Sequence, residues 1–142
     1  MGLSCLQTKL LTLSFRVNLL DKIKDVPDGM TLLKDWVGGD GVVVDQETAQ
    51  KRADICIKCP MNRHGSILTQ SVASAIKQYL EFKSKIGLRV DGEKLLFHCE
   101  ACGCVNRLQI WCPDKFFSSH STPEEIEKYD SGCWKRRITT NT

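Results

Sequence analysis

The sequence predicts an α+β fold, a small cysteine-rich domain with an inserted helix and an N-terminal β-strand region. Three observations lead to this class. The chain has 142 residues, which suffices for one compact domain with a modest core. Eight cysteines are present, and seven of them lie between positions 56 and 133. Helical and strand periodicities both occur along the chain, separated by turn signals.

The N-terminal part, residues 1–45, is predicted to be a strand region. Residues 11–19 alternate strictly between apolar and polar side chains, which is typical of a half-buried strand. A turn is expected at 27–29 and a flexible corner at 38–41, because both segments contain glycine. Residues 42–44 are three valines, which suit either a short strand or an apolar segment attached to the core.

Two helices are predicted in the middle of the chain. Asp45 can cap the first, which is expected to run to about Ala53 and to deliver Cys56 at its C-terminal end. The second is expected over 69–86, where apolar residues recur every four positions and Gly87 supplies a stop signal.

The C-terminal part is predicted to contain a hairpin, a strand and a short helix. Asp91-Gly92 between 88–90 and 94–97 has the composition of a tight hairpin turn, and 105–112 is expected as a strand. Thr122-Pro-Glu-Glu matches a capping box with a first-turn proline, for a helix that ends near Tyr129. We therefore expect a cysteine domain over 46–136, followed by a polar tail at 137–142.

Charge and targeting signals restrict the class of protein. The net charge is +3, divided into −2 for residues 1–50 and +5 for the remainder, a mild bias that permits nucleic-acid contact without requiring it. No segment approaches the roughly 18 apolar residues of a membrane span, and the N-terminus does not resemble a signal peptide. Leu6 stands where a myristoylation motif has Ser or Thr. We expect a cytoplasmic protein, whose close cysteine pairs hold metal rather than form disulfides.

Two CxxC pairs predict a metal site. Cys56-Ile-Lys-Cys59 is the first and Cys99-Glu-Ala-Cys102 the second, and Cys104 follows at once. Two intervening residues allow a tight turn to direct both thiolates at one ion, and four thiolates match tetrahedral zinc. Such a site has no open coordination position, so the zinc is expected to be structural. This makes the predicted fold a small zinc-knuckle or zinc-ribbon-like domain in which helix 69–86 is inserted between the knuckles.

The ligand set stays open at this level. Cys104 and Cys133 give six cysteines, which could hold two zinc ions through shared thiolates, or one ion with a substitution in the set. His64, His98 and His120 are further candidate ligands. An iron–sulfur cluster is an alternative, although the spacing does not match the ferredoxin run. Cys5 and Cys112 are expected to be buried or free thiols.

The pattern Arg52-x3-Cys56-x2-Cys59-Pro-x-Asn62, then Cys99-x2-Cys102-Gly-Cys104 and Cys133-Trp-Lys, resembles a diffuse group of small cysteine-rich zinc-binding proteins encoded by bacteriophages and prophages. Trp36-Val-Gly-Gly adds to the likeness, which covers residues 36–136. The resemblance implies that the ligands come from Cys56, Cys59, Cys99, Cys102, Cys104 and Cys133. It also implies a bacterial host cytoplasm and, for some members, binding to host or defence machinery.

Enzymatic interpretations have weaker support. His98-Cys-Glu100 matches half of the zinc deaminase motif, but the downstream P-C-x-x-C is missing. An HNH-like nuclease needs a histidine base and further ligands, and the interval 60–98 offers only His64 and His98. Cys56-Cys59 as a redox dithiol would need a thioredoxin-like setting that the flanking sequence does not supply. No catalytic residue is therefore assigned.

Aromatic and basic residues mark a candidate binding surface in the C-terminal part. Such residues can stack on bases and neutralise phosphates, or anchor a protein partner. The alternative is that at least two of Trp111, Phe116 and Trp134 pack in the core. The candidate surface comprises Arg107, Trp111, Lys115, Phe117, Trp134, Lys135, Arg136 and Arg137.

These observations predict a non-enzymatic, zinc-stabilised binding protein with one or two structural zinc ions. The first expectation is a phage accessory protein that binds and blocks or modulates a host or defence protein. The alternative is a nucleic-acid-binding zinc protein that uses the basic, aromatic C-terminal part, and an HNH-like nuclease is a distant third. No membrane association and no small-molecule substrate are expected.

Overall fold

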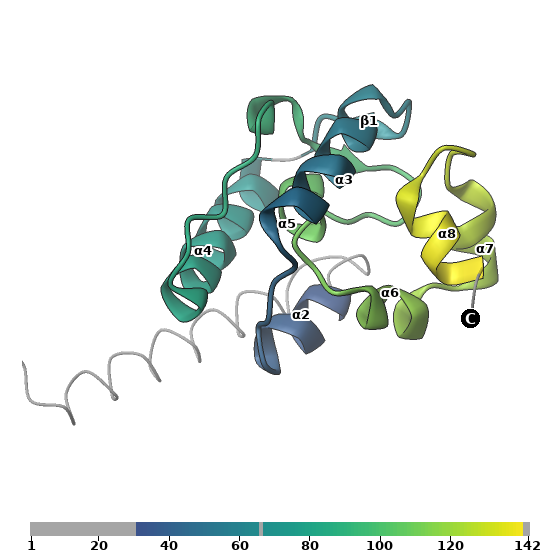
Figure 1. Ribbon diagram of the computed structural model, residues 1–142. Helices are drawn as coiled ribbons and strands as arrows, with labels where there is room; N and C mark the ends of the chain where they lie inside the picture. Colours follow the sequence, from purple (N-terminus) through teal and green to yellow (C-terminus); the bar gives the residue numbers. More distant parts are fainter. Residues whose placement is uncertain (1–30, 66, 141–142) are drawn as a thin grey trace, which may run out of the picture.

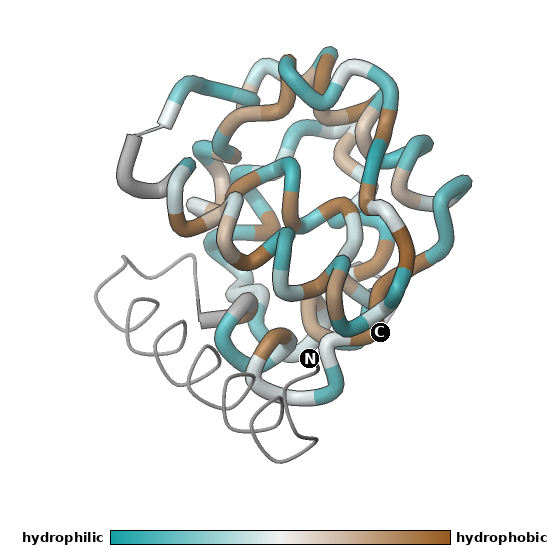
Figure 2. Tube along the Cα trace, turned by 90° about the vertical axis from the view of Figure 1, so that its left-hand side faces the viewer, coloured by the Kyte–Doolittle hydropathy of each residue, from teal (hydrophilic) through white to brown (hydrophobic). Residues whose placement is uncertain are grey.

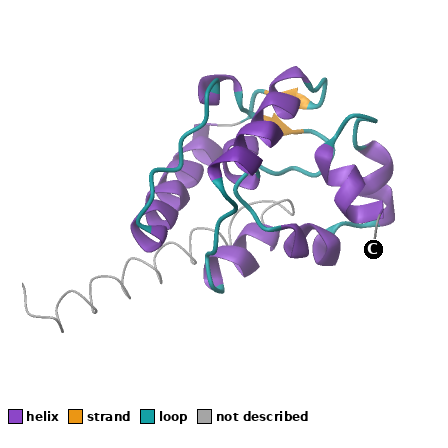
Figure 3. Ribbon diagram, viewed as in Figure 1, coloured by secondary structure: helices purple, strands orange, loops and turns teal. Residues whose placement is uncertain are grey.

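A computed structural model describes residues 31–65 and 67–140. Helices predominate among them, and one small sheet is present (Figures 1 and 3). In chain order the elements are α2 (Thr31–Gly38), α3 (Gln46–Lys58), β1 (Asn62–Arg63), α4 (Ile67–Ser84), the 3-10 helix η2 (Glu93–Leu95), β2 (His98–Cys99), α5 (Asn106–Gln109), α6 (Asp114–His120), α7 (Pro123–Lys128) and α8 (Trp134–Thr140). The fold is therefore α+β in the broad sense. The predicted strand at 11–19 and the turn at 27–29 lie outside the described residues.

The small sheet joins two segments that are distant in sequence. β1 and β2 pair antiparallel, with Asn62 opposite Cys99 and Arg63 opposite His98. Helix α3 contacts β1. Helix α5 contacts α3 and α4, and α6 contacts α2 and α8. In Figure 1, α4 lies on one side of α3 and α5, and α7 and α8 lie on the other.

The predicted helix after Asp45 is confirmed and is longer than expected. The Asp45 carboxylate accepts a hydrogen bond from the Thr48 backbone N–H at 2.8 Å, which caps α3. The helix continues to Lys58 because no residue interrupts it before Cys59. Cys59 precedes a proline, which disfavours helical backbone, and its φ and ψ of −75° and 132° are extended.

The helix predicted over 69–86 is also confirmed, two residues earlier in the chain, as α4. Its inner face consists of Val72, Ala73, Ile76 and Leu80, all buried. The helix ends at Ser84, and Lys85 then adopts a left-handed φ of 60°. The stop therefore comes from Lys85 rather than from the predicted Gly87.

The hairpin predicted around Asp91-Gly92 is wrong. Gly92 does have a left-handed φ of 77°, but it leads into η2 rather than into a returning strand. Side chains from elsewhere satisfy the backbone of this segment. The Gln50 amide accepts from the Asp91 N–H at 2.8 Å and donates to the Asp91 carbonyl at 3.3 Å, and Gln46 donates to the Arg89 carbonyl. A partner strand is not needed once these groups are paired.

The strand predicted over 105–112 is wrong as well. Asn106–Gln109 is the helical turn α5, and the residues that follow it, Ile110, Trp111 and Cys112, are all buried. Consecutive buried residues do not carry the two-residue alternation of a half-buried strand. The helical turn places Asn106 and Gln109 on one side, where their amides hydrogen-bond.

One main core connects the described helices. Trp36 of α2 and Leu80 of α4 belong to it, together with Trp111 and with Trp134 of α8, so it extends across the boundary predicted at position 45. Hydrophobic and hydrophilic residues are interspersed along the trace (Figure 2). Val43 and Val44 pack against this core from a loop, as the second of the two expectations for residues 42–44 had it, whereas Val42 is 55% exposed.

Besides α5, the described residues contain three α-helices that were not anticipated: α2, α6 and α8. The predicted polar tail begins inside α8, where the Thr139 hydroxyl donates to the Lys135 carbonyl at 2.9 Å and the side chain is buried. Among the described residues, no helix combines the length and apolar character needed to cross a membrane.

The capping box of α7 is confirmed in both directions. The Thr122 hydroxyl accepts from the Glu125 N–H at 3.2 Å, and the Glu125 carboxylate accepts from the Thr122 N–H at 3.3 Å. Thr122→Ala is expected to lower the free energy of unfolding by about 1 kcal/mol, because the first turn loses its side-chain acceptor. Urea unfolding measures this, with Thr122→Ser as the control that retains the cap. An alanine variant as stable as the wild type would contradict this assignment.

Candidate metal centre

The six cysteines predicted as ligands come from four parts of the fold. We call them the cysteine cluster: Cys56, Cys59, Cys99, Cys102, Cys104 and Cys133. Cys56 is buried near the end of α3, and Cys59 is the half-buried C-cap of that helix. Cys99 is on β2, and Cys102 and Cys104 follow in the adjoining turn. Cys133 directly precedes α8 and is buried.

The β1–β2 pairing brings the two CxxC segments together. The Cys59 carbonyl accepts from the Asn62 N–H at 3.1 Å, so the first segment leads directly into β1. The Glu100 N–H donates to the Met61 carbonyl at 2.9 Å, which attaches the second segment to the first. This sheet therefore brings the two predicted CxxC pairs close together.

The second CxxC segment has the tight turn that the motif predicts. The Gly103 N–H donates to the Cys99 carbonyl at 2.8 Å, and the Cys99 N–H donates to the Cys104 carbonyl at 2.9 Å. Gly103 has a left-handed φ of 75°, which glycine adopts without steric cost. This turn holds Cys99, Cys102 and Cys104 close to one another.

Residues of α7 and α8 complete the surroundings of the cluster. Cys99 and Cys133 pack with Ala101 and Tyr129 in a small apolar group beside the main core, and Cys102 contacts that group. The Trp134 indole N–H donates to the Cys56 sulfur at 3.3 Å. Helix α8 therefore contacts both CxxC segments.

Lys135 is the main electrostatic feature of the cluster. Its side chain is 1% exposed, and its ammonium donates to the Cys102 sulfur at 3.0 Å, the Cys99 sulfur at 3.4 Å and the Gln109 amide oxygen at 3.2 Å. The ammonium also lies 4.7 Å from the centre of the Tyr129 ring. No ion pair joins Lys135 to a carboxylate among the described residues. The sulfurs are therefore its nearest potential anions.

A chain of side-chain amides, half-buried at Asn62 and buried at Asn106 and Gln109, holds Lys135 in place. The Asn62 amide oxygen accepts from the Phe97 N–H at 2.9 Å and from the Asn106 amide at 2.8 Å, and Asn106 in turn accepts from Gln109. The Gln109 amide oxygen accepts from Lys135. This network links β1, α5 and α8, so the position of the ammonium depends on three elements.

Protonation of the thiols depends on this environment. Burial raises the pKa of Cys56 to about 12, despite the Trp134 hydrogen bond. A hydrogen bond with Cys104, followed by burial, raises the pKa of Cys102 to about 11. The hydrogen bond with Cys102 and burial also raise the pKa of Cys99. Burial alone would lower the pKa of Lys135, but sulfur charges on Cys102 and Cys99 outweigh it and raise that pKa.

The directions of these pKa shifts indicate what kind of ion suits the cluster. Without a metal ion, Cys56, Cys99 and Cys102 hold their protons at neutral pH, and a bound metal would release them. Buried sulfur ligands with N–H donors from Lys135 and Trp134 match the chemistry of a thiolate centre and its outer shell. As the described side chains lie, no three His, Cys, Asp or Glu residues form a group that could hold a metal ion.

The remaining candidate ligands lie in different surroundings. His64 is exposed and its ring lies 4.0 Å from that of Phe97, while His120 pairs with Asp35 of α2 at 2.9 Å. His98 Nδ1 is buried and has no hydrogen-bond partner among the described residues. Cys112 is buried in the main core, and none of the seven described cysteines forms a disulfide. Cys5 lies outside the described residues.

The residues of the predicted binding surface divide into two sets. The aromatic members and Lys135 are buried, and Trp111 and Trp134 pack in the main core, as the core alternative expected. They are therefore not exposed to a partner in this conformation. Lys115 is exposed and pairs with Asp40 at 3.3 Å, and half-buried Arg136 donates to the Tyr129 carbonyl at 3.0 Å. Arg137 is exposed, and Arg107 lines a separate pocket.

Arg52 has a structural role that the sequence pattern does not reveal. Its side chain is 5% exposed and donates to the carbonyls of Ile110 at 3.0 Å and Cys112 at 2.7 Å, and it also pairs with Asp114. The guanidinium lies 4.2 Å from the centre of the Trp134 ring. Arg52 thereby fixes α3, the segment after α5 and α8 around the cluster. In the sequence, the only signal for Arg52 was its place in the Arg52-x3-Cys56 pattern. The spacing of residues does not show what a side chain contacts in the fold.

No family model, curated protein or solved structure matches this chain. The interpretation of the site depends on its own residues.

Proposed function

We propose that this chain is a non-enzymatic binding protein in which the cysteine cluster holds structural zinc. The observation that carries the proposal is the buried ammonium of Lys135, which contacts the sulfurs of Cys99 and Cys102. A buried cation needs an anionic partner to offset its lost hydration. Metal-bound thiolates are anionic at neutral pH, whereas buried thiols of raised pKa are not.

In this proposal zinc stabilises the fold and activates no water. The ligands would come from the six cysteines of the cluster, as one ion held by four thiolates or as two ions with shared thiolates. Each arrangement leaves negative charge on the sulfurs, which the Lys135 ammonium and the Trp134 N–H would offset. The binding energy of the metal would supplement the small apolar group around Cys99 and Cys133.

The surface that we propose for partner binding is the C-terminal end of α4 and the turn that follows it. Phe82 of α4 is 65% exposed, and Ile86, in the turn after the helix, is 48% exposed. Exposed Lys83 and Lys85 lie next to them in sequence. This combination suits a protein with an apolar depression rimmed by carboxylates. A host or defence protein of that kind remains our first choice, in the bacterial cytoplasm if the chain is phage-encoded.

Nucleic-acid binding remains the second candidate. The rings of Trp111, Phe117 and Trp134, which were expected to stack on bases, are buried, which removes the main argument for this candidate. Exposed Arg137 and Lys115 alone constitute a weaker electrostatic argument.

The partner proposal predicts a specific loss on changing α4. In pull-downs of the tagged full chain from host cells, Phe82→Ser with Ile86→Ser is expected to abolish recovery of one discrete protein, because the apolar contact is removed. Leu95→Ser is the matched control, since Leu95 is 53% exposed on η2, and it should retain that protein.

Three results would contradict the α4 assignment. The double variant could recover the same protein as the wild type, Leu95→Ser could abolish its recovery equally, or the wild type could capture nucleic acid alone. Thermal unfolding of each variant shows that the exposed substitutions leave the fold intact.

A further inference from the structure

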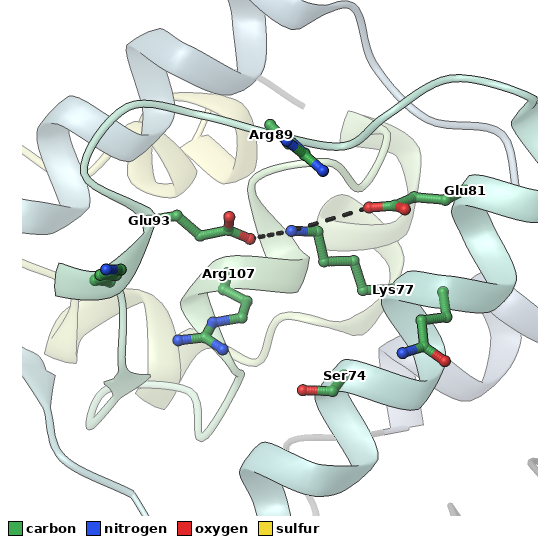
Figure 4. A pocket seen from close by; sticks show the side chains of 8 residues that line it. Ser74, Lys77, Glu81, Arg89, Glu93 and Arg107 are labelled. Carbon is green, nitrogen blue, oxygen red and sulfur yellow. Dashed lines mark hydrogen bonds and ion pairs between the residues drawn. The ribbon is translucent and has the colours of Figure 1, made fainter.

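A polar pocket of about 530 Å³ lies between α4, the segment 89–94 and α5 (Figure 4). Arg107 of α5 lines it, whereas Gln109 of the same short helix faces the cysteine cluster through Lys135. The pocket is on the α4 side of α5, and α8 lies on the other side in Figure 1. It is therefore separate from the candidate metal centre.

Positive charge is in excess in this pocket. Lys77, Arg89, Lys94 and Arg107 line it, against Glu81 and Glu93. Both carboxylates are directed at Lys77: Glu93 pairs with its ammonium, and Glu81 lies 3.9 Å from it. Neither Arg89 nor Arg107 forms an ion pair with a carboxylate of the described residues. Two guanidiniums are thus left to face an anion from solution.

Figure 4 shows how these side chains are arranged. Arg89 and Arg107 extend from different segments, and in this view they lie on opposite sides of the Lys77–Glu93 pair. Guanidiniums bind phosphate through paired N–H donors, which makes arginine a preferred phosphate ligand. An excess of two positive charges matches the charge of a phosphomonoester near neutral pH.

We propose that this pocket binds a small, hydroxyl-bearing phosphomonoester, such as a sugar phosphate. Because the Arg107 guanidinium points away from Arg89 in Figure 4, the two side chains would rotate toward a shared phosphate to bind it. Ser74 and Gln78 offer hydrogen-bond partners for hydroxyls. The described lining residues include no aromatic ring to stack on a base, which favours a sugar over a nucleotide. The volume lies within the range of small-molecule sites.

Titration calorimetry on the full chain tests this proposal. A hexose monophosphate is expected to bind, with at least about tenfold weaker binding of the free hexose, inorganic phosphate, a nucleoside monophosphate and short single-stranded DNA. Arg89→Ala and Arg107→Ala are each expected to weaken binding about tenfold through the loss of a charge-assisted contact. Glu81→Gln should strengthen binding severalfold by removing a negative charge. Arg63→Ala, which removes an exposed guanidinium outside the pocket, should change nothing.

Each alternative outcome overturns the proposal. Undetectable hexose monophosphate binding, or affinity unchanged in the Arg89→Ala/Arg107→Ala double variant, would exclude this pocket as the site. Inorganic phosphate bound as tightly as the hexose monophosphate would exclude recognition of the sugar. Tighter binding of the nucleotide or of DNA would assign the pocket to a different ligand class. Arg89 is exposed, and Arg107 and Glu81 are half-buried, so thermal unfolding of each variant verifies that the fold is retained.

Discussion

Arg52→Ala is expected to lower the free energy of unfolding by about 3 kcal/mol, because two buried carbonyls lose their donor. The Arg52 guanidinium is the described side-chain partner of the Ile110 and Cys112 carbonyls, at 3.0 and 2.7 Å. It also packs on Trp134, whose indole contacts the Cys56 sulfur. The substitution should therefore loosen α8 as well as the segment after α5.

Two further variants separate the parts of this effect. Arg52→Lys should recover little stability, since one ammonium cannot reproduce the forked geometry of two carbonyl bonds and a carboxylate pair. Asp114→Asn should cost less than about 1 kcal/mol, because the Asp114 side chain is 61% exposed and exposed ion pairs contribute little. Urea unfolding measures all three. Equal losses for Arg52→Ala and Asp114→Asn would show that the ion pair, and not the carbonyl contacts, stabilises the fold.

Cys99→Ser is expected to abolish zinc binding and cooperative thermal unfolding, whereas Cys112→Ser retains both. Cys99 is in the cysteine cluster, within hydrogen-bond distance of Lys135, and Cys112 is an equally buried cysteine of the main core. If zinc supplies folding energy, loss of a ligand removes that energy, while the control loses only local packing. Circular dichroism and metal analysis of both variants measure the difference.

Because Cys99→Ser also alters the Lys135 contact, chelation of the wild type provides a second readout. A chelator should lower the melting temperature of the unmodified chain, and added zinc should restore it. A structural metal would be contradicted if the chelator left the melting temperature of the wild type unchanged and the two serine variants lost cooperative unfolding equally.

Elements with strong local signals were predictable, and elements formed by tertiary contacts were not. Asp45 and Thr122 have side chains that cap a helix by themselves, so α3 and α7 begin where the sequence indicated. Segment 88–97 has the composition of a hairpin, but Gln46 and Gln50 of α3 pair its backbone instead. No pattern within segment 88–97 indicates that side chains so distant in the sequence will lie beside it.

The candidate site shows the same division. The CxxC spacing predicted that the two cysteine pairs meet, and the β1–β2 pairing brings their segments together. Lys135 belongs to a run of three basic residues that suggested an exposed patch, yet it is buried against sulfur. Helix α8 begins at Trp134, and the helix turns the next residue inward. Charge patterning gave no indication of this because the relevant partners lie 33 and 36 positions away.

The central claim is that the cysteine cluster holds zinc. Metal analysis of the purified full chain, combined with native mass spectrometry, tests it most directly. The account predicts about one or two zinc ions per chain, with all six cluster cysteines reduced. Less than about one equivalent of zinc, with iron in its place or with the cluster cysteines joined in disulfides, would contradict it.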